Sequence, residues 1–272
     1  MCGLPVPGHE LEGIRHAGEE DESDREEGDE EDGCLGISIY LDKFDKELEY
    51  RGLRFVRYAD DCDIFVRSEK AADRVMASVS SWLERKLRLK VSASKTKVVR
   101  PTKSTFLGFN FWKSTEGWKP RPAKDRKARL CEKVKTVLCR KRAAAMPLGA
   151  VFTKLNQILR GWINYFRIGS MKGWLRDDFC PWMRHKVRVV ILKQWKRPKK
   201  IYRNLMRLNT KMHCNMTHED IFKVANSRLG LFRRAGRNVV NFLLGPKVLS
   251  LPNKKENRPG LVDPLAYYLG NT

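Results

Sequence analysis

The sequence predicts an α+β fold: a small segment of strands and helices, followed by a larger segment that is basic and mostly helical. Two features predict the small segment. Apolar runs at strand spacing flank a short acidic turn, and a stretch with apolar residues every three or four positions follows them. A third feature predicts the helical segment, because from about Pro120 the chain reads as helices separated by proline and glycine.

The first 36 residues differ in composition from the rest of the chain. They hold 13 acidic and 2 basic side chains, and the run from Glu19 to Asp32 is almost entirely Glu, Asp and Gly. A segment this polar cannot bury enough apolar surface to fold, so we expect a disordered acidic leader over residues 1–36. Two roles stay open for it: an autoinhibitory mimic of nucleic acid, or none.

Ordered structure is expected from residue 37. Apolar side chains first recur at helical spacing, at Ile39, Leu41, Phe44 and Leu48. Gly52 ends that pattern, and residues 53–58 and 62–67 then read as two strands. The residues between them, Ala59-Asp60-Asp61, predict a tight turn. The pair therefore forms a β-hairpin with two carboxylates at its tip.

An amphipathic helix is expected after the hairpin, over residues 69–89, with Ser68 as its N-cap. Two further strands are expected at 96–100 and 105–112. Beyond them the sequence predicts a series of helices, at 124–145, 148–168, 174–195, 198–208 and 218–226.

The charge distribution indicates a polyanionic partner. The net charge of +23 divides into −11 for the leader and +34 for residues 37–272. A surface this basic binds phosphates by releasing their counterions, so nucleic acid is the expected partner and an anionic membrane surface the weaker alternative. The 42% of hydrophobic residues excludes wholesale disorder, and no apolar run approaches the roughly 18 residues of a membrane span.

Seven cysteines are scattered along the chain without a CxxC pair, which argues against a zinc ribbon and against a disulfide framework. The first residues lack the basic and apolar regions of a secretory signal. We therefore expect reduced thiols and a cytoplasmic protein, with an organelle as the alternative compartment.

The hairpin tip carries the chemistry. Asp60 and Asp61 place two like charges within a few ångströms, an arrangement that a shared divalent cation stabilises. Two-metal phosphoryl-transfer sites use such carboxylates to hold Mg²⁺ ions about 4 Å apart. Taken alone, the four residues from Tyr58 to Asp61 favour an acidic turn that is simply exposed to water. The hairpin, helix and strand in succession around them favour a polymerase palm.

Several blocks, in order, resemble one family. Residues 55–61, Phe-Val-Arg-Tyr-Ala-Asp-Asp, resemble the catalytic box of reverse transcriptases, specifically of group II intron-encoded proteins. Residues 94–97 and 106–109 resemble the next two blocks of the family, and residues 155–166 resemble the start of its maturase-specific helical domain. With the closing residues 263–269, the resemblance covers the chain from about Ile39 to its end.

The resemblance implies a partial palm at residues 37–119 and a helical thumb and maturase-specific domain at residues 120–272. It implies that Asp60 and Asp61 are catalytic and bind Mg²⁺, and that Tyr58 and Ala59 shape the tip near the primer. Lys95 would lie near the triphosphate of the incoming dNTP, with a solvated loop lysine as the alternative. A strand containing Phe106, Leu107 and Gly108 would support the primer end, and core packing explains the same residues.

One difference from the family bears on activity. A reverse transcriptase palm needs a third carboxylate on a strand upstream of the hairpin, and only 59 residues precede Asp60. The fingers and that first aspartate have no counterpart here. We therefore expect a truncated RNA-directed DNA polymerase that is inactive alone.

The helical half is expected to bind RNA. Its basic side chains include Arg160 and Arg167, and they are densest at Lys196, Arg197, Lys199 and Lys200. Further basic runs lie at 121–129, 133–142, 184–188 and 193–203. With Trp162, Trp174, Trp182 and Trp195 among them, they suit phosphate contacts and stacking on unpaired bases. One face of helix 148–168 is expected to be core, with Phe152, Leu155, Leu159, Trp162 and Phe166.

Three hypotheses remain. The first is a truncated group II intron reverse transcriptase/maturase that binds intron RNA, with an RNA/DNA primer-template, dNTPs and Mg²⁺ as the further partners of its ancestral reaction. The second is a non-catalytic RNA-binding maturase that assists intron folding. The third is an inactive pseudogene product.

Overall fold

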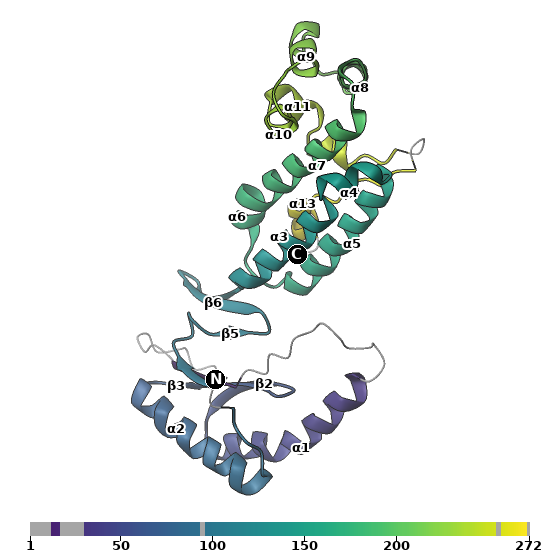
Figure 1. The fold of residues 1–272 in the computed structure, drawn as a ribbon. Helices are drawn as coiled ribbons and strands as arrows, with labels where there is room; N and C mark the ends of the chain where they lie inside the picture. The colour runs from purple at the N-terminus through teal and green to yellow at the C-terminus, as the bar shows by residue number, and fades with distance from the viewer. Residues whose placement is uncertain (1–11, 17–29, 93–95, 254–256, 271–272) are drawn as a thin grey trace. The chain divides into compact units, whose positions relative to one another are not determined.

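The computed structural model describes residues 12–16, 30–92, 96–253 and 257–270. The chain divides into two compact units, residues 1–120 and 121–272 (Figure 1). The predicted mixture of helices and small sheets is confirmed. Most of the expected disordered leader lies outside the described residues. Within residues 1–36, the structure has a strand at Glu12–His16 and a helix that begins at Glu30. The composition of this segment predicted no regular structure there.

Unit 1 contains a four-stranded sheet in the order β2-β3-β1-β4. Its strands are β1 (Glu12–His16), β2 (Arg54–Tyr58), β3 (Asp61–Val66) and β4 (Lys97–Val99). Strands β2 and β3 form the predicted hairpin, with Tyr58 opposite Asp61, so Ala59 and Asp60 are the two turn residues. Strand β1 lies between β3 and β4 and is antiparallel to both. Pairing at such a distance along the chain leaves no local signal in the sequence.

Two helices cover one face of this sheet, α1 (Glu30–Tyr50) and α2 (Glu69–Trp82), the second extended by a π-helical turn, η1 (Leu83–Leu87) (Figure 1). Their buried side chains pack against alternate residues of β3 in one cluster, which includes Leu48, Ile64 and Val79. As predicted, Ser68 caps α2, because its side chain accepts a hydrogen bond from the Ala71 N–H at 3.3 Å. Ile39 was expected on the apolar face of the first helix but is 68% exposed.

A second sheet has three strands in the order β5-β6-β7: β5 (Thr105–Phe106), β6 (Phe109–Ser114) and β7 (Gly117–Pro122). The prediction of one strand over 105–112 is therefore wrong. Leu107 and Gly108 have φ values of 49° and 77°, and they turn the chain between β5 and β6. Two successive positive φ values are typical of a two-residue hairpin turn, which glycine favours. Strand β7 was not predicted.

Unit 2 is helical, as predicted. Its first helices lie close to their expected bounds, except that residues 124–145 divide at Leu138 and Cys139. They are α3 (Lys124–Val137), α4 (Arg140–Ala145), α5 (Leu148–Phe166), α6 (Lys172–Trp174), the π-helical η2 (Leu175–Phe179), α7 (Cys180–Trp195), α8 (Pro198–Lys211) and α9 (His218–Ala225). Four shorter helices follow that were not predicted: α10 (Leu231–Ala235), α11 (Asn238–Leu243), α12 (Pro246–Ser250) and α13 (Pro264–Gly270).

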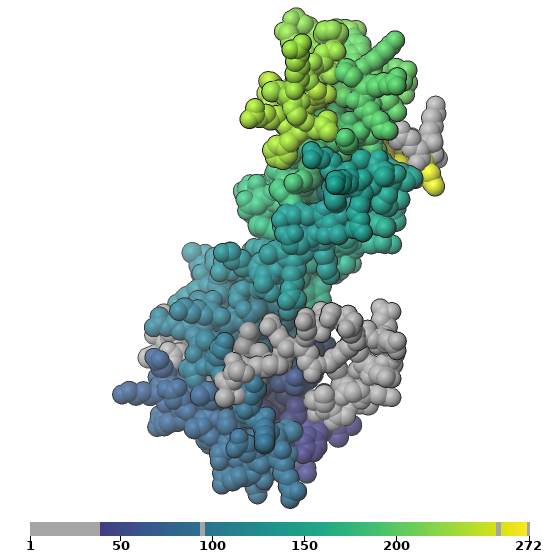
Figure 2. All heavy atoms as spheres, in the orientation of Figure 1, coloured from purple at the N-terminus to yellow at the C-terminus, as the bar shows by residue number. Residues whose placement is uncertain are grey.

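Helix α5 is central to the packing of unit 2. Of its expected core residues, Phe152, Leu155, Leu159 and Phe166 are buried and Trp162 is half-buried. The buried Asn156 donates a hydrogen bond to the Gly260 carbonyl and accepts one from the Val262 N–H, both at 2.8 Å, which fastens the C-terminal segment to α5. The side chains of α8 to α11 form one continuous mass in the upper part of Figure 2. None of the described helices is long and apolar enough to cross a membrane.

Candidate active site and RNA-binding surface

The acidic turn between β2 and β3 is held in a backbone conformation that side chains disfavour. Ala59 has φ 52°, in the left-handed region where a Cβ approaches the following carbonyl. Such a residue costs about 1–3 kcal/mol and persists only when its surroundings hold it in place. Asp60 beside it is exposed, and Asp61, the first residue of β3, is half-buried. The turn therefore presents two successive carboxylates on a strained support.

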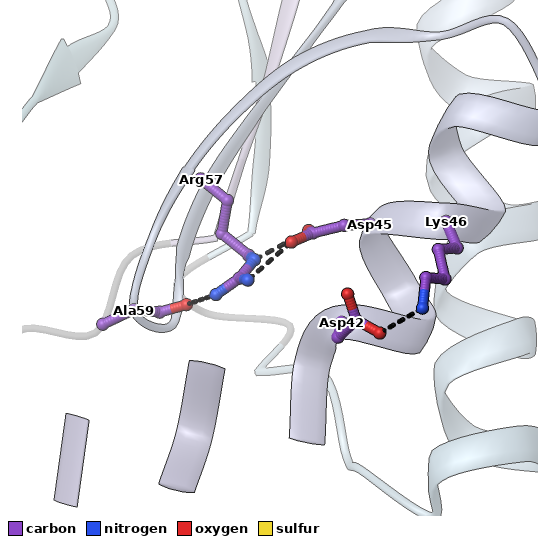
Figure 3. A network of polar contacts seen from close by, with 5 residues as sticks. All are labelled: Asp42, Asp45, Lys46, Arg57 and Ala59. Carbon is purple, nitrogen blue, oxygen red and sulfur yellow. Dashed lines mark hydrogen bonds and ion pairs between the residues drawn. The ribbon is translucent and has the colours of Figure 1, made fainter. Parts of the chain in front are cut away.

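Arg57 supplies that support (Figure 3). Its Nε and Nη2 atoms donate to the two carboxylate oxygens of Asp45 on α1, at 2.7 and 2.5 Å, and its Nη1 donates to the Ala59 carbonyl at 2.8 Å. The hydrogen bonds to Asp45 raise the pKa of Arg57 above its usual value. The Arg57 guanidinium thus links β2, α1 and the acidic turn.

A third aspartate follows two residues after Asp61. Asp63 is 2% exposed, and its Oδ2 accepts a hydrogen bond from the Ser104 hydroxyl at 3.1 Å. Residues two apart in a strand lie on the same face, so Asp61 and Asp63 share the sheet face opposite the helices. Cys62 lies on the helix-covered face, where burial, with a smaller contribution from Asp63, raises its pKa to about 12. This thiol is therefore neutral and unreactive.

The donor set of the turn fits a weak magnesium site. Among the described residues, no group of three or more His, Cys, Asp or Glu side chains is arranged to hold a metal ion. Mg²⁺ is, however, usually bound through one or two carboxylates, with water and substrate phosphate completing its octahedron. Asp60 and Asp61 supply two hard oxygen ligands with access to solvent, which is the minimum such a site requires.

The other residues expected near a primer divide into three groups. Tyr58 is 62% exposed at the end of β2, beside the turn. Phe106, Leu107 and Gly108 do not lie in one strand, because Leu107 and Gly108 form the turn between β5 and β6. Lys95 lies outside the described residues. Among the described residues, Tyr58 and Ala59 adjoin the two aspartates in the β2–β3 hairpin, whereas Phe106, Leu107 and Gly108 belong to the hairpin of the second sheet.

In unit 2, the basic residues expected to bind RNA are exposed. Arg160 lies on α5 and Arg167 follows its last turn, while Lys196, Arg197, Lys199 and Lys200 form the junction of α7 and α8 and the first turn of α8. Within the described part of the chain, no ion pair joins any of these last four cations to an acidic side chain. Their charge is therefore available to a partner.

The basic run at residues 184–188 is not such a surface. Arg188 is 7% exposed and donates to the Asn241 side-chain oxygen at 2.6 Å and to the Leu244 carbonyl at 3.1 Å. Burial lowers the pKa of Arg188 to about 10. Arg184 pairs with Asp263 at 3.3 Å. These two side chains hold α7 to later segments of unit 2, so this run is structural rather than RNA-binding.

Three of the tryptophans expected to stack on bases pack against other aromatic rings. The ring centroids of Trp162 and Trp174 lie 5.7 Å apart, and Phe179 lies 5.0 Å from Trp174 and 5.8 Å from Trp182. The Lys127 ammonium lies 5.0 Å above the Trp174 ring, and burial lowers its pKa. These rings form a side-chain cluster of unit 2.

Two family models match the chain. The reverse transcriptase (RNA-dependent DNA polymerase) model matches residues 34–111, and the model of the group II intron maturase-specific domain matches residues 127–209. The chain belongs to the group II intron reverse transcriptases/maturases. No curated protein matches it.

Each match covers one of the two candidate sites of this reverse transcriptase/maturase. The polymerase match contains most of α1, the acidic turn and the Arg57 network, and the maturase match contains α5 and the cations at the start of α8. Polymerases of the first family generally use Mg²⁺, and the two domains together indicate intron RNA as a partner.

Sequence reasoning missed the residues that support the turn of this reverse transcriptase/maturase. Asp45 lies twelve positions before Arg57, on a separate element, so no spacing rule connects the two. Asp63 had a signal, since its alternation with Asp61 placed both on one strand face. A buried carboxylate within an otherwise apolar strand requires a hydrogen-bond partner, and that requirement could have pointed to Asp63.

Proposed function

We propose that this reverse transcriptase/maturase acts as an RNA-binding maturase: it grips group II intron RNA through the exposed cations of its helical domain and does not polymerise DNA alone. In this proposal residues 37–119 are a partial palm, and residues 120–272 are the thumb and maturase-specific domain. We expect the activity inside the cell, where the intron RNA is transcribed.

The exposed basic junction between α7 and α8 carries the RNA-binding part of the proposal. Lys196, Arg197, Lys199 and Lys200 concentrate four positive charges within five residues, without an acidic partner among the described residues. Cations held this close on a folded surface repel one another unless phosphates neutralise them. Structured RNA supplies phosphates at a similar density and is recognised mainly by shape and backbone.

The acidic turn carries the second part. We assign Asp60 and Asp61 as ligands of one weakly held Mg²⁺, which would supply charge neutralisation to a nucleotide phosphate. Tyr58 and Ala59 would then shape the approach of a primer, and Lys95 that of a triphosphate. Two carboxylates support ion binding but not the two-metal arrangement that polymerisation uses. The protein's contribution at this turn is to hold the carboxylates in place through Arg57.

Binding to intron RNA tests the first part. Fluorescence anisotropy with a labelled group II intron RNA, repeated over a series of KCl concentrations, gives the slope of log affinity against log salt. Four phosphate contacts predict a slope of about −3, and replacing the four cations with glutamine should remove most of it. A wild-type affinity that does not change with salt would contradict the proposal.

Primer extension tests the second part. The chain is incubated with an RNA template, a DNA primer, dNTPs and Mg²⁺, and we expect no incorporation. Incorporation that Asp60→Ala abolishes would overturn this part and make the chain a polymerase. Terbium luminescence, titrated with the wild type and with Asp60→Asn, separately tests whether the turn binds a metal ion.

A further inference from the structure

Unit 2 contains a cavity of about 840 Å³. It lies among the end of α7, the second half of α8, α12 and the two residues Asn253 and Arg258. Its volume falls within the range of about 300–1,000 Å³ that is typical of pockets for small organic ligands. Of the residues expected from the sequence to bind RNA, Trp195 lines it, whereas the expected cations Arg160, Arg167, Lys196, Arg197, Lys199 and Lys200 do not.

The charged side chains that line this cavity, among the residues that the structure describes, are all basic. They are Arg207, Lys211 and Arg258. Arg207 and Lys211 are both exposed and lie four residues apart on α8, so they occupy the same helix face. Like charges at this spacing destabilise a helix, and a bound anion would relieve their repulsion.

The third cation is held in place by its neighbours. Asn253 and Arg258 exchange two backbone hydrogen bonds, at 2.8 and 3.0 Å, which bring Arg258 to the cavity wall. The Arg258 guanidinium lies 5.2 Å from the centre of the Phe152 ring. A cation positioned by a backbone bridge and a buried aromatic ring loses little conformational entropy when it contacts a ligand.

Apart from Asn204 and Asn253, the remaining lining is apolar, and it includes one aromatic ring. Ile191 and Leu249 are buried, and Trp195, at the end of α7, is half-buried in the lining. Unlike the three tryptophans of the aromatic cluster, Trp195 has no aromatic partner among the described ring pairs. An indole beside an apolar surface offers a nucleobase a stacking face.

An indole among apolar side chains and three cations together match a nucleobase with its flanking phosphates. We propose that this cavity takes one unpaired, extruded nucleotide of the bound RNA, with its base against Trp195 and its phosphates at Arg207 and Lys211. The inference rests on the proposed RNA-binding function. It requires that the RNA contain an unpaired nucleotide, which a fully paired helix cannot supply. Phosphate contacts to the exposed cations of α8 do not require one.

Two RNA hairpins test this inference, one with a single bulged adenine and one fully paired but otherwise identical. Binding of each to the full chain is measured by fluorescence anisotropy. Stacking of one base predicts that the bulged hairpin binds about tenfold or more tightly than the paired one. The variant R207Q/K211Q should lose this preference, and Trp195→Leu, which keeps apolar bulk but removes the indole, should reduce it.

The matched control is K199Q/K200Q, which removes the same charge from the same helix outside the cavity. It should weaken binding of both hairpins while leaving their ratio unchanged. Equal binding of the two hairpins by the wild type, or a preference that survives R207Q/K211Q, would overturn the cavity inference and leave the proposed function standing. Failure to bind either hairpin would overturn both.

Discussion

The most specific prediction concerns the hydrogen-bond network that joins Arg57 to Asp45 and to the Ala59 carbonyl. The perturbation is Arg57→Gln, which removes all three hydrogen bonds of the network. It leaves Asp45 without its cation and the left-handed Ala59 without its support. If the network holds the acidic turn, the substitution should loosen the β2–β3 hairpin and change the unfolding of unit 2 little.

The magnitude follows from the exposure of the pair. The side chains of Arg57 and Asp45 are 11% and 25% exposed, between a fully buried ion pair and a surface one. Breaking a buried pair costs about 3–5 kcal/mol, whereas an exposed pair contributes about 0–1 kcal/mol. With the additional hydrogen bond to Ala59, we expect a loss of about 2–3 kcal/mol, which multiplies the opening constant of the hairpin by about 30 to 150.

Hydrogen-exchange mass spectrometry on peptides covering residues 54–66 measures this opening directly. Arg51→Gln is the matched control, because Arg51, which follows α1, donates to Glu47 at 2.7 Å and to Ser78 of α2 at 2.9 Å, and neither partner belongs to the turn. It should cost less than about 1 kcal/mol. Asp45→Asn and the double variant complete a cycle whose coupling energy should exceed about 1 kcal/mol. Exchange in Arg57→Gln that matches the control, with no coupling to Asp45→Asn, would refute the reasoning.

Three further predictions follow from the same structure. Alkylation at pH 8, followed by peptide mass spectrometry, should label Cys139 well before Cys62. Cys139 is exposed and backbone N–H groups lower its pKa, whereas burial raises the pKa of Cys62 to about 12. Equal labelling rates would contradict this prediction. Arg188→Gln should lower the free energy of unfolding of unit 2 by about 3 kcal/mol in urea, whereas Lys199→Gln should leave it unchanged. Similar urea midpoints for the two variants would show that Arg188 is not structural. Ala59→Gly should stabilise the hairpin by about 0.5–1 kcal/mol, because glycine accepts φ 52° without strain, and faster hydrogen exchange in this variant would argue against strain at the turn.

Local patterns predicted the parts of the fold that depend on neighbouring residues. The β2–β3 hairpin and the Ser68 cap follow from alternation and from a single side chain, and both are present. The turn at Leu107 and Gly108 was missed although a glycine within a strand pattern was a signal for it. Helices α10 to α13 have five to seven residues each, too short to be stable alone, so their formation depends on tertiary packing that no local pattern encodes.

The candidate sites divide in the same way. Asp60 and Asp61 could be found because they are adjacent and lie between two strands, but the partner of Arg57 could not, since α1 brings Asp45 to it only in the folded chain. Composition also could not separate Arg188 from Lys199. Both belong to basic runs, and only packing shows that the first is buried and the second exposed.

Splicing tests the central claim most directly. The rate of a group II intron's self-splicing is measured at a limiting Mg²⁺ concentration, alone, with the wild-type chain, and with the variant K196Q/R197Q/K199Q/K200Q. The proposed maturase function predicts that the wild type accelerates splicing and that the variant, folded by circular dichroism, does so far less. No acceleration by the wild type, or equal acceleration by both proteins, would contradict the claim that this basic surface grips intron RNA.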